Sequence, residues 1–161
     1  MFYNKFKDKV EKSKIELKNE IYKYGLNYRK KFVWGIIGIN LFIMGSYFTY
    51  ANYRNGNKLS MVLSLIVLFF AFSFIYMIFE YKISIDLQKK KIFYKKVEIS
   101  LDNIKKVTLR YMLPAGMKRL DICLDIITKD KVQIIIPLMM NNKLEFTSII
   151  KGILEKEFYI E

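Results

Sequence analysis

The chain has 161 residues, of which 53% are hydrophobic and 27% are charged, and its formal net charge is +13. A soluble globular domain seldom combines these values, so the apolar and the charged residues must be segregated along the chain. The sequence contains no histidine and a single cysteine, which excludes an internal disulfide and removes the commonest general base and metal ligand.

Residues 1–31 are predicted to form one basic amphipathic helix in the cytoplasm. At about 100° per residue, the apolar side chains fall on one stripe, which comprises Phe2, Phe6, Val10, Leu17, Ile21, Tyr24 and Tyr28. Such a helix can lie in the headgroup region of a membrane, with its lysines facing anionic lipid. The alternatives are that the stripe packs on the cytoplasmic domain or on a second copy of the chain, or that the segment is disordered.

Two uncharged apolar segments follow, with 22 residues at 32–53 and 21 residues at 59–79. At about 1.5 Å per residue, a helix of either length spans the hydrocarbon core of a bilayer, which is roughly 30 Å thick. A pair of buried core helices is the alternative, but the rest of the chain is too short to wrap two helices that are apolar all round. We therefore expect a transmembrane hairpin over residues 32–80. The preceding segment has no small-residue cleavage pattern, so it is not expected to be a signal peptide.

Basic residues flank the predicted hairpin on one side of the membrane. They are Lys12, Lys14, Lys18, Lys23, Arg29, Lys30 and Lys31 before the first helix, and Lys82, Lys89, Lys90, Lys91, Lys95 and Lys96 after the second. The connection between the helices offers only Arg54 and Lys58. Because basic residues favour the cytoplasmic side, we expect a multi-pass protein of the inner membrane with both chain ends in the cytoplasm. The Asn55-Gly56 turn would lie outside.

Small residues cluster on one side of each predicted membrane helix. They are Gly35, Gly38, Gly45, Ser46 and Thr49 in the first, and Ser60, Ser64 and Ala71 in the second. Small side chains let two helix backbones approach in lipid, so the stripes are expected to face each other inside the hairpin. A docking face for a partner helix is the alternative. Neither helix contains an ionisable residue, which argues against an ion pathway, and the amide of Asn40 is expected to form a helix-helix hydrogen bond.

From Tyr81 onward, apolar and polar residues alternate with a period of two. Five antiparallel strands with one buried face are predicted, at residues 81–87, 91–99, 106–111, 120–126 and 131–138. Residues 141–158 then show a helical period, with Asn141 or Asn142 as the N-cap. A curved sheet or partial barrel closed by this helix would form an α+β cytoplasmic domain over residues 81–161.

The third and fourth predicted strands satisfy one pairing register on both faces, in which paired residue numbers sum to 231. On the buried face this register places Val107 opposite Leu124, Leu109 opposite Ile122 and Tyr111 opposite Leu120. On the other face it places Lys106 opposite Asp125 and Arg110 opposite Asp121. Each pair of opposite charges across a ladder stabilises the pairing by roughly 0.2–1 kcal/mol.

The order of a helical hairpin, strands and a terminal helix resembles the membrane-anchored subset of the bacterial pleckstrin-homology-like domain family. The stretches that carry the resemblance are "ISIDLQKKKIFYKKVEISLDNIKKVTL", "LDICLDIITKDKVQIIIPL" and "LEFTSIIKGILEK", within residues 81–157. The likeness is one of pattern, without an invariant chemical motif. The full fold of that family has seven strands, so five predicted strands imply an incomplete barrel or an edge strand from a neighbour. The resemblance implies a non-enzymatic module that binds proteins or lipids at a membrane.

A basic cluster is the best candidate binding site for anionic lipid headgroups, and it comprises Lys89, Lys90, Lys91, Lys95 and Lys96. Arg29, Lys30 and Lys31, before the first membrane helix, are added as weaker candidates for lipid or partner binding. The alternative for the cluster is a solvated turn that protects a sheet edge. If the first strand stands upright on the membrane, it spans roughly 23 Å, and the lysines of the cluster, which follow this strand, then point away from lipid.

The remaining features predict no chemistry. Cys123 lies on the strand face that carries Asp121 and Asp125, where neighbouring carboxylates disfavour a thiolate, so it is expected to be inert. No phosphate-binding glycine loop, metal site or cofactor site is predicted, and the flanking lysines account for the net charge without nucleic acid. The loop at residues 112–119 could grip a partner or lipid, or it could fold back over its own barrel.

These observations predict a non-enzymatic, membrane-anchored module that holds a protein partner or anionic lipid at the cytoplasmic surface. Its expected partners are the lipid bilayer, anionic lipid headgroups, and another protein or further copies of the chain. The alternative is an immunity or stress-protection protein against membrane-active peptides, an association known for some anchored relatives of the resembled family.

Overall fold

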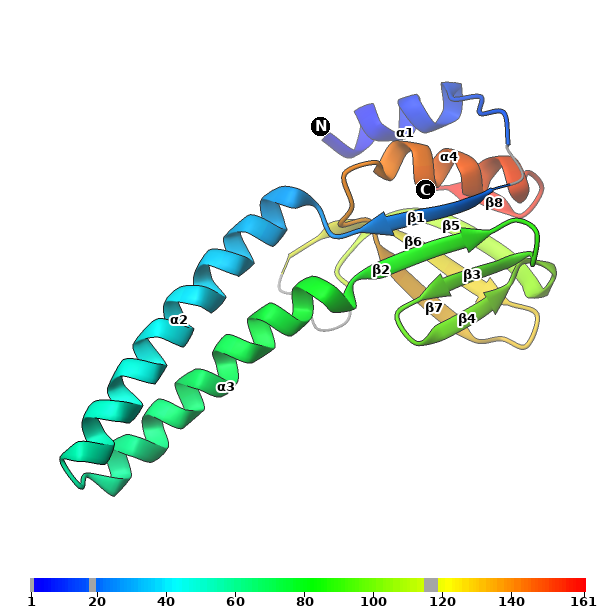
Figure 1. Cartoon of the computed structure of the whole chain (residues 1–161). Coiled ribbons are helices and arrows are strands. Elements are labelled where there is room, and N and C mark those ends of the chain that lie inside the picture. The colour runs from blue at the N-terminus through cyan, green and yellow to red at the C-terminus, as the bar shows by residue number, and fades with distance from the viewer. Residues whose placement is uncertain (1, 18–19, 115–118) are drawn as a thin grey trace. The chain divides into compact units, whose positions relative to one another are not determined.

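The computed structural model describes residues 2–17, 20–114 and 119–161 (Figure 1). The chain divides into two compact units. One is built from Met1–Gly25 together with Lys82–Glu161, and the other is Leu26–Tyr81. The second unit is therefore inserted into the sequence of the first.

The inserted unit is a helical hairpin of α2 (Tyr28–Arg54) and α3 (Lys58–Glu80). Asparagine caps both helix starts: the Asn27 side chain accepts a hydrogen bond from the Arg29 N–H at 2.8 Å, and the Asn57 side chain accepts one from the Ser60 N–H at 3.2 Å. Such caps satisfy backbone donors that a helix leaves without partners. The predicted helices are confirmed, with slightly longer bounds.

Small residues form the contact between α2 and α3. Gly38, Gly45, Ser64 and Ala71 are buried. A Cβ atom added at Gly45 would lie 2.9 Å from Leu68 Cγ, which is closer than carbon atoms pack. Glycine is thus required for this close approach, and the expectation that the two stripes face each other is confirmed for these four residues.

Both hairpin helices are long and apolar enough to cross a membrane. In the most apolar 18-residue stretch of each helix, 11% of the residues are buried. A core helix of a soluble protein would be mostly buried instead. Large apolar side chains therefore cover the outside of the hairpin, as membrane association requires. The predicted layout of two apolar helices followed by a sheet-rich domain is confirmed.

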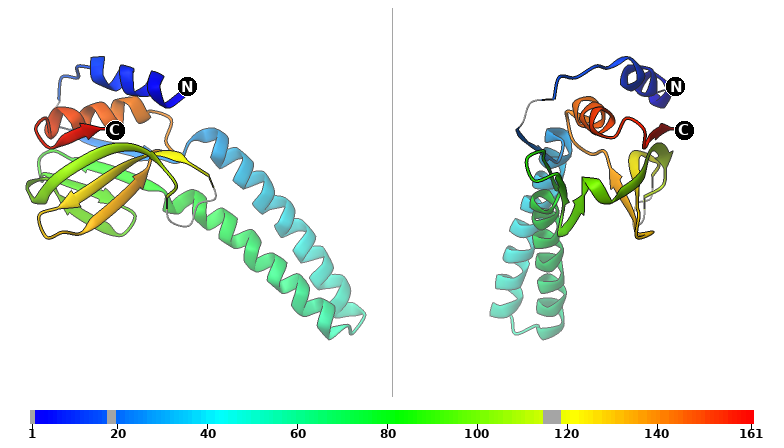
Figure 2. Two further views of the ribbon diagram at one scale, coloured as in Figure 1. Left: turned by 180° about the vertical axis from the view of Figure 1, so that it is seen from behind. Right: turned by 90° about the vertical axis from the view of Figure 1, so that its right-hand side faces the viewer.

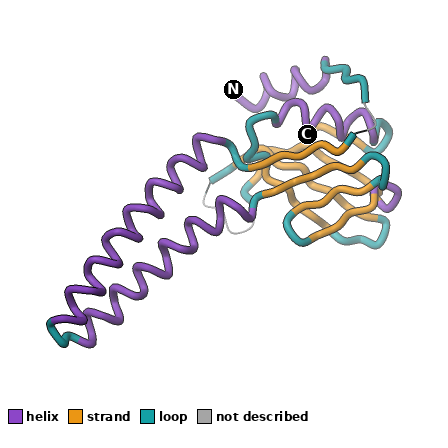
Figure 3. Tube along the Cα trace, in the orientation of Figure 1, coloured by secondary structure: helices purple, strands orange, loops and turns teal. Residues whose placement is uncertain are grey.

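The other unit contains eight strands within its described residues (Figure 3). The first sheet has the order β1-β2-β3-β4 and is antiparallel throughout. Its strands are β1 (Ile21–Gly25), β2 (Lys82–Asp86), β3 (Lys91–Tyr94) and β4 (Val97–Ser100).

The second sheet has the order β7-β6-β5-β8, and β8 runs parallel to β5. Its strands are β5 (Ile104–Met112), β6 (Asp121–Thr128), β7 (Gln133–Pro137) and β8 (Phe158–Ile160). A 3₁₀ turn at Leu101–Asn103 connects the two sheets along the chain.

The hydrophobic core of this unit is closed by α4 (Lys143–Ile153), which contributes the fully buried side chains of Phe146, Ile149 and Ile150. From the two sheets, the largest fully buried side chains are Ile83, Ile85, Ile92, Leu109, Ile122, Leu124, Ile126 and Ile136. α4 lies over the sheets, and α1 (Phe2–Lys12) lies along α4 (Figure 2). The predicted helix and its N-cap position are confirmed, since α4 begins directly after Asn142. Its predicted end at residue 158 is wrong, because α4 stops at Ile153 and Phe158 begins β8.

The prediction of one helix over residues 1–31 is wrong. Residues 2–12 form α1, but Ile21–Gly25 form β1, which pairs with β2. Ladder hydrogen bonds to β2 and the burial of Tyr24 outweigh the local helical period in this segment. α1 itself packs on the protein: Val10 is fully buried, and the Lys151 ammonium donates to the carbonyl oxygens of Val10 and Glu11.

The prediction of five strands is also wrong. Residues 91–99 form two strands joined by a tight turn, in which Lys95 has a φ of +53°. The sequence expectation also missed β1, which precedes the hairpin, and β8, which has only three residues. The segment at 106–111 belongs to the longer strand β5.

The predicted register between the third and fourth strands is wrong by two residues. β5 and β6 pair Val107 with Ile126, Leu109 with Leu124 and Tyr111 with Ile122. Because strand side chains alternate with a period of two, a two-residue shift keeps each side chain on its face but changes its neighbours. Tyr111 and Leu120, expected on the buried face, are 51% and 54% exposed, because they lie at and beyond the end of the buried part of this ladder.

The charged pairs change with the register. Lys106 lies opposite Ile127, and Arg110 lies opposite Cys123. The Arg110 Nη1 atom instead reaches diagonally to the buried carboxylate of Asp125, at 3.0 Å. The expected pairs of Lys106 with Asp125 and of Arg110 with Asp121 are therefore replaced by one diagonal ion pair.

Candidate functional site

The structure separates the predicted lysine cluster into two groups. Lys89 and Lys90 lie in the turn between β2 and β3, whereas Lys95 and Lys96 lie in the turn between β3 and β4, at the opposite end of β3. Lys91 forms an ion pair with Glu98, and Lys90 forms one with Asp102. One headgroup therefore does not meet all five lysines, and the prediction of a single cluster is wrong because residues 91–99 form a hairpin.

Arg29, Lys30 and Lys31, the weaker candidates, occupy the first turn of α2 in the hairpin unit. The Arg29 guanidinium lies 5.9 Å from the centre of the Tyr28 ring. These three side chains thus mark the end of α2 that is nearest in sequence to β1.

A groove of about 540 Å³ lies at the end of the first sheet where β1 stops and β2 starts, and we call it the sheet groove. It is lined by Lys23, Tyr24, Gly25, Lys82, Ile83, Ser84, Phe93 and Lys95. The strand register assembles it: Gly25 pairs with Lys82, Lys23 with Ser84, and Ser84 with Phe93. The Lys95 N–H donates to the Lys82 carbonyl oxygen at 3.3 Å, which places the β3–β4 turn beside the start of β2.

The sheet groove has the chemistry of an anion site. Lys23, Lys82 and Lys95 are exposed, and no carboxylate occurs among the described residues that line the groove. Ser84 adds a hydroxyl group and Phe93 adds a half-buried aromatic ring. Three ammonium groups next to a hydroxyl donor suit a phosphate-bearing group.

Sequence reasoning assigned only Lys95 of these three lysines to a site. Lys82 and Lys23 contributed to the predicted membrane orientation, but Lys23 could not be placed beside Lys82 while residues 1–31 were expected to be helical. Alternation of apolar residues around Tyr22 and Tyr24 is too short to identify β1 by itself. The pairing of β1 with β2 is a tertiary feature, because the whole hairpin lies between them in the sequence.

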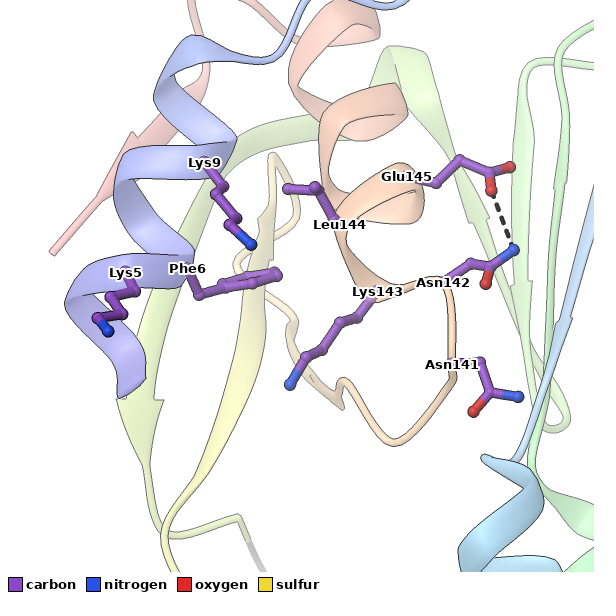
Figure 4. A pocket seen from close by; sticks show the side chains of 8 residues that line it. All are labelled: Lys5, Phe6, Lys9, Asn141, Asn142, Lys143, Leu144 and Glu145. Carbon is purple, nitrogen blue, oxygen red and sulfur yellow. Dashed lines mark hydrogen bonds between the residues drawn. The ribbon is translucent and has the colours of Figure 1, made fainter. Parts of the chain in front are cut away.

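A second groove, of about 580 Å³, lies between α1 and the start of α4, and we call it the helix groove (Figure 4). It is lined by Lys5, Phe6, Lys9, Asn141, Asn142, Lys143, Leu144 and Glu145. Phe6 and Lys9 point from α1 toward α4, and the Lys143 ammonium lies 5.3 Å from the centre of the Phe6 ring.

The helix groove contains a carboxylate that is already engaged. Glu145 accepts hydrogen bonds from the Asn142 amide and from the Tyr24 hydroxyl, each at 3.1 Å. Burial, followed by the nearby Glu145 carboxylate, raises the pKa of Tyr24 above its ordinary value, so the hydroxyl stays a donor at neutral pH. The helix groove thus has as many lysines as the sheet groove, but its positive charge is partly neutralised.

The second sheet carries a polar network around Asp125. Its carboxylate accepts from Arg110 at 3.0 Å and from the Gln133 amide at 2.8 Å, and Arg110 also donates to Glu161 at 2.7 Å. Cys123 is buried beside this network. Burial, together with Asp121 and Asp125, raises the pKa of the Cys123 thiol to about 12, which agrees with the expectation of an inert cysteine.

Other predicted features add no site. The loop at 112–119 includes residues 115–118, which lie outside the described residues, while Leu113 is exposed and Pro114 is buried. Within residues 2–17, 20–114 and 119–161, the acidic and cysteine side chains form no group of three that could hold a metal ion.

Comparison of the chain with protein-family models, with curated protein sequences and with solved structures found no match. Function must therefore be inferred from the residues and from the way in which the fold places them.

Proposed function

We propose that the protein is a non-enzymatic, membrane-anchored interaction module whose sheet groove holds the phosphate group of an anionic lipid at the cytoplasmic surface. α2 and α3 would cross the inner membrane as a hairpin, with both chain ends in the cytoplasm. The pleckstrin-homology-like resemblance would draw on seven strands, β1 to β4 and β5 to β7, followed by α4. An additional strand, β8, comes after α4 and pairs in parallel with β5.

The observation that carries this proposal is the point at which the hairpin joins the sheet. β1 ends at Gly25 and α2 begins at Tyr28, while α3 ends at Glu80 and β2 begins at Lys82. At full extension, these links span at most about 11 Å and about 7 Å. A hairpin that crosses a bilayer therefore keeps the Gly25–Lys82 end of the sheet within reach of the headgroups.

The charge of the groove then selects the lipid. Lysines near an anionic membrane surface each contribute about 1 kcal/mol of attraction. Lys23, Lys82 and Lys95 surround one concave site, so a headgroup can contact all three together. Arg29, Lys30 and Lys31 would add attraction at the start of α2.

The test is lipid retention by the full chain in detergent micelles, measured by native mass spectrometry with phosphatidylglycerol and with phosphatidylcholine. We expect the wild type to retain phosphatidylglycerol in preference. A triple variant should weaken that retention about tenfold or more, because each lost charge removes roughly 1 kcal/mol of attraction to the anionic lipid. This variant combines Lys23→Gln, Lys82→Gln and Lys95→Gln.

The helix groove provides a matched control. Lys5→Gln, Lys9→Gln and Lys143→Gln combined remove the same total charge from the other groove. Retention equal to that of the wild type is expected in this control. An equal loss in both triple variants would show that only net charge attracts the lipid, and unchanged retention in the sheet-groove variant would exclude the proposed site.

A further inference from the structure

Asn40 is an exposed amide near the middle of α2. At about 100° per residue, its direction differs by about 160° from that of Gly38 and by about 140° from that of Gly45, the residues that contact α3. Asn40 therefore lies on the opposite side of α2 from the hairpin contact. The hydrogen bond expected between α2 and α3 through Asn40 is not formed.

The Asn40 amide is only partly satisfied. Its Nδ2 atom donates to the Ile36 carbonyl oxygen of the same helix at 2.8 Å. Across the part of the chain that the structure describes, no other hydrogen bond is made by this side chain. One N–H group and the Oδ1 acceptor thus face outward. In the hydrocarbon of a bilayer, where water is absent, such groups are costly to leave without partners.

An apolar row surrounds the amide on the same face of α2. It consists of Val33, Ile36, Met44 and Tyr47, at −7, −4, +4 and +7 positions from Asn40, and all four are exposed. This spacing is the one by which two helices pack along a seam, with a single polar residue that fixes their register.

We propose that this row, centred on Asn40, is a homodimer interface within the membrane. An amide both donates and accepts hydrogen bonds, so its simplest complement is a second Asn40. Two copies inserted in the same orientation place Asn40 at the same depth, and a two-fold axis along the membrane normal lets the side chains exchange hydrogen bonds reciprocally. The inference rests on the proposed membrane insertion of the hairpin and not on lipid binding in the sheet groove.

The test measures association of the full chain in lipid bilayers by energy transfer between donor-labelled and acceptor-labelled copies, titrated against the lipid-to-protein ratio. Asn40→Leu should raise the dimer dissociation constant about tenfold. An interhelical hydrogen bond in model membrane helices contributes roughly 1–2 kcal/mol, which corresponds to a change of this size. Asn40→Gln, which keeps the amide, should retain most of the association.

Ser73 supplies the matched control. It lies in α3, and its hydroxyl donates to the Phe69 carbonyl oxygen of its own helix at 2.9 Å. Ser73→Ala should leave the dissociation constant unchanged. Equal dissociation constants for the wild type and Asn40→Leu would overturn the proposal. A wild-type chain that stays monomeric at every lipid ratio would also overturn it, and would point to a different partner helix.

Cross-linking tests the face directly. In a Cys123→Ala background, Met44→Cys should form an intermolecular disulfide on mild oxidation, whereas Ile39→Cys, about 100° around the helix from Asn40, should not. Equal cross-linking at both positions would contradict the interface. Extraction of the chain from membranes by alkaline carbonate would instead refute membrane insertion itself, and a dimer without lipid retention would refute only the sheet groove.

Discussion

Gly25 and Lys82 lie opposite each other in the β1–β2 ladder, although both apolar helices separate them in the sequence. The hairpin is therefore inserted where an ordinary β-hairpin would have its turn. This arrangement makes the segment before the helices a strand of the sheet, and it joins the sheet to the helices at both ends of the insertion.

Replacing residues 26–81 by Asn-Gly should yield a folded protein that is soluble without detergent. The two flanking residues are already paired across neighbouring antiparallel strands, and Asn-Gly suits a two-residue connection between them. Size-exclusion chromatography without detergent, circular dichroism and cooperative thermal unfolding would measure this. If the shortened chain precipitates or unfolds without cooperativity, the sheet unit depends on its hairpin.

The fragment 82–161 is the matched comparison, and it should not unfold cooperatively. It lacks β1, so β2 loses one of its two ladder partners and becomes the edge strand of the first sheet. It also lacks Tyr24, whose ring packs edge-on against Phe146 with centroids 5.1 Å apart. A fragment as stable as the shortened chain would show that β1 is dispensable.

Gly45→Ala should destabilise the hairpin by about 1–2 kcal/mol relative to Gly35→Ala, because an added methyl group overpacks the helix contact. The new Cβ would lie 2.9 Å from Leu68 at position 45, but 3.9 Å from its nearest neighbour, Ile78, at position 35. Both variants share the gain in helix propensity, so their difference isolates the packing. SDS titration in mixed micelles, followed through Trp34 fluorescence, would measure it. Equal midpoints would contradict the close contact.

A double-mutant cycle should find coupling between Arg110 and Asp125, of about 1 kcal/mol or more in unfolding free energy. The Asp125 side chain is fully buried and meets Arg110 Nη1 at 3.0 Å. The variants are Arg110→Met, Asp125→Asn and their combination. A parallel cycle with Asp121→Asn should give a smaller coupling, because Asp121 faces Met112 in the ladder. Stronger coupling to Asp121 would restore the register in which residue numbers sum to 231.

Cys123 should resist thiol reagents in the folded protein. Only the thiolate reacts, and a rise in pKa from 9.0 to about 12 lowers the thiolate fraction at pH 8 about a thousandfold. Reactivity should therefore increase as the pH approaches 12. Absorbance assays with an aromatic disulfide reagent, with and without denaturant, would compare the two states. Rapid reaction at pH 8 without denaturant would show that the strand is accessible.

The sequence could predict the features that depend on neighbours along the chain. The hairpin helices follow from two long uncharged segments, and the fold of α4 follows from its helical period after Asn142. The side-chain faces of β5 and β6 were also predicted correctly at Val107, Leu109 and Leu124, since alternation is a local property.

The pairing partners could not be predicted in the same way. Two registers that differ by two residues bury the same faces, so alternation could not choose between Asp121 and Asp125 as the partner of Arg110. The single lysine cluster failed for a related reason, because a turn at Lys95 divides what looked like one continuous strand.

By itself, the sequence determined that this protein has two helices apolar enough for a membrane and a sheet domain after them, because composition and periodicity are properties of consecutive residues. Only the tertiary structure decided that β1 joins that sheet, that Lys23 lies beside Lys82 and Lys95, and that Asn40 faces away from α3. Those relations depend on backbone hydrogen bonds and packing between residues far apart in the chain, and these override the local helical period of residues 21–25.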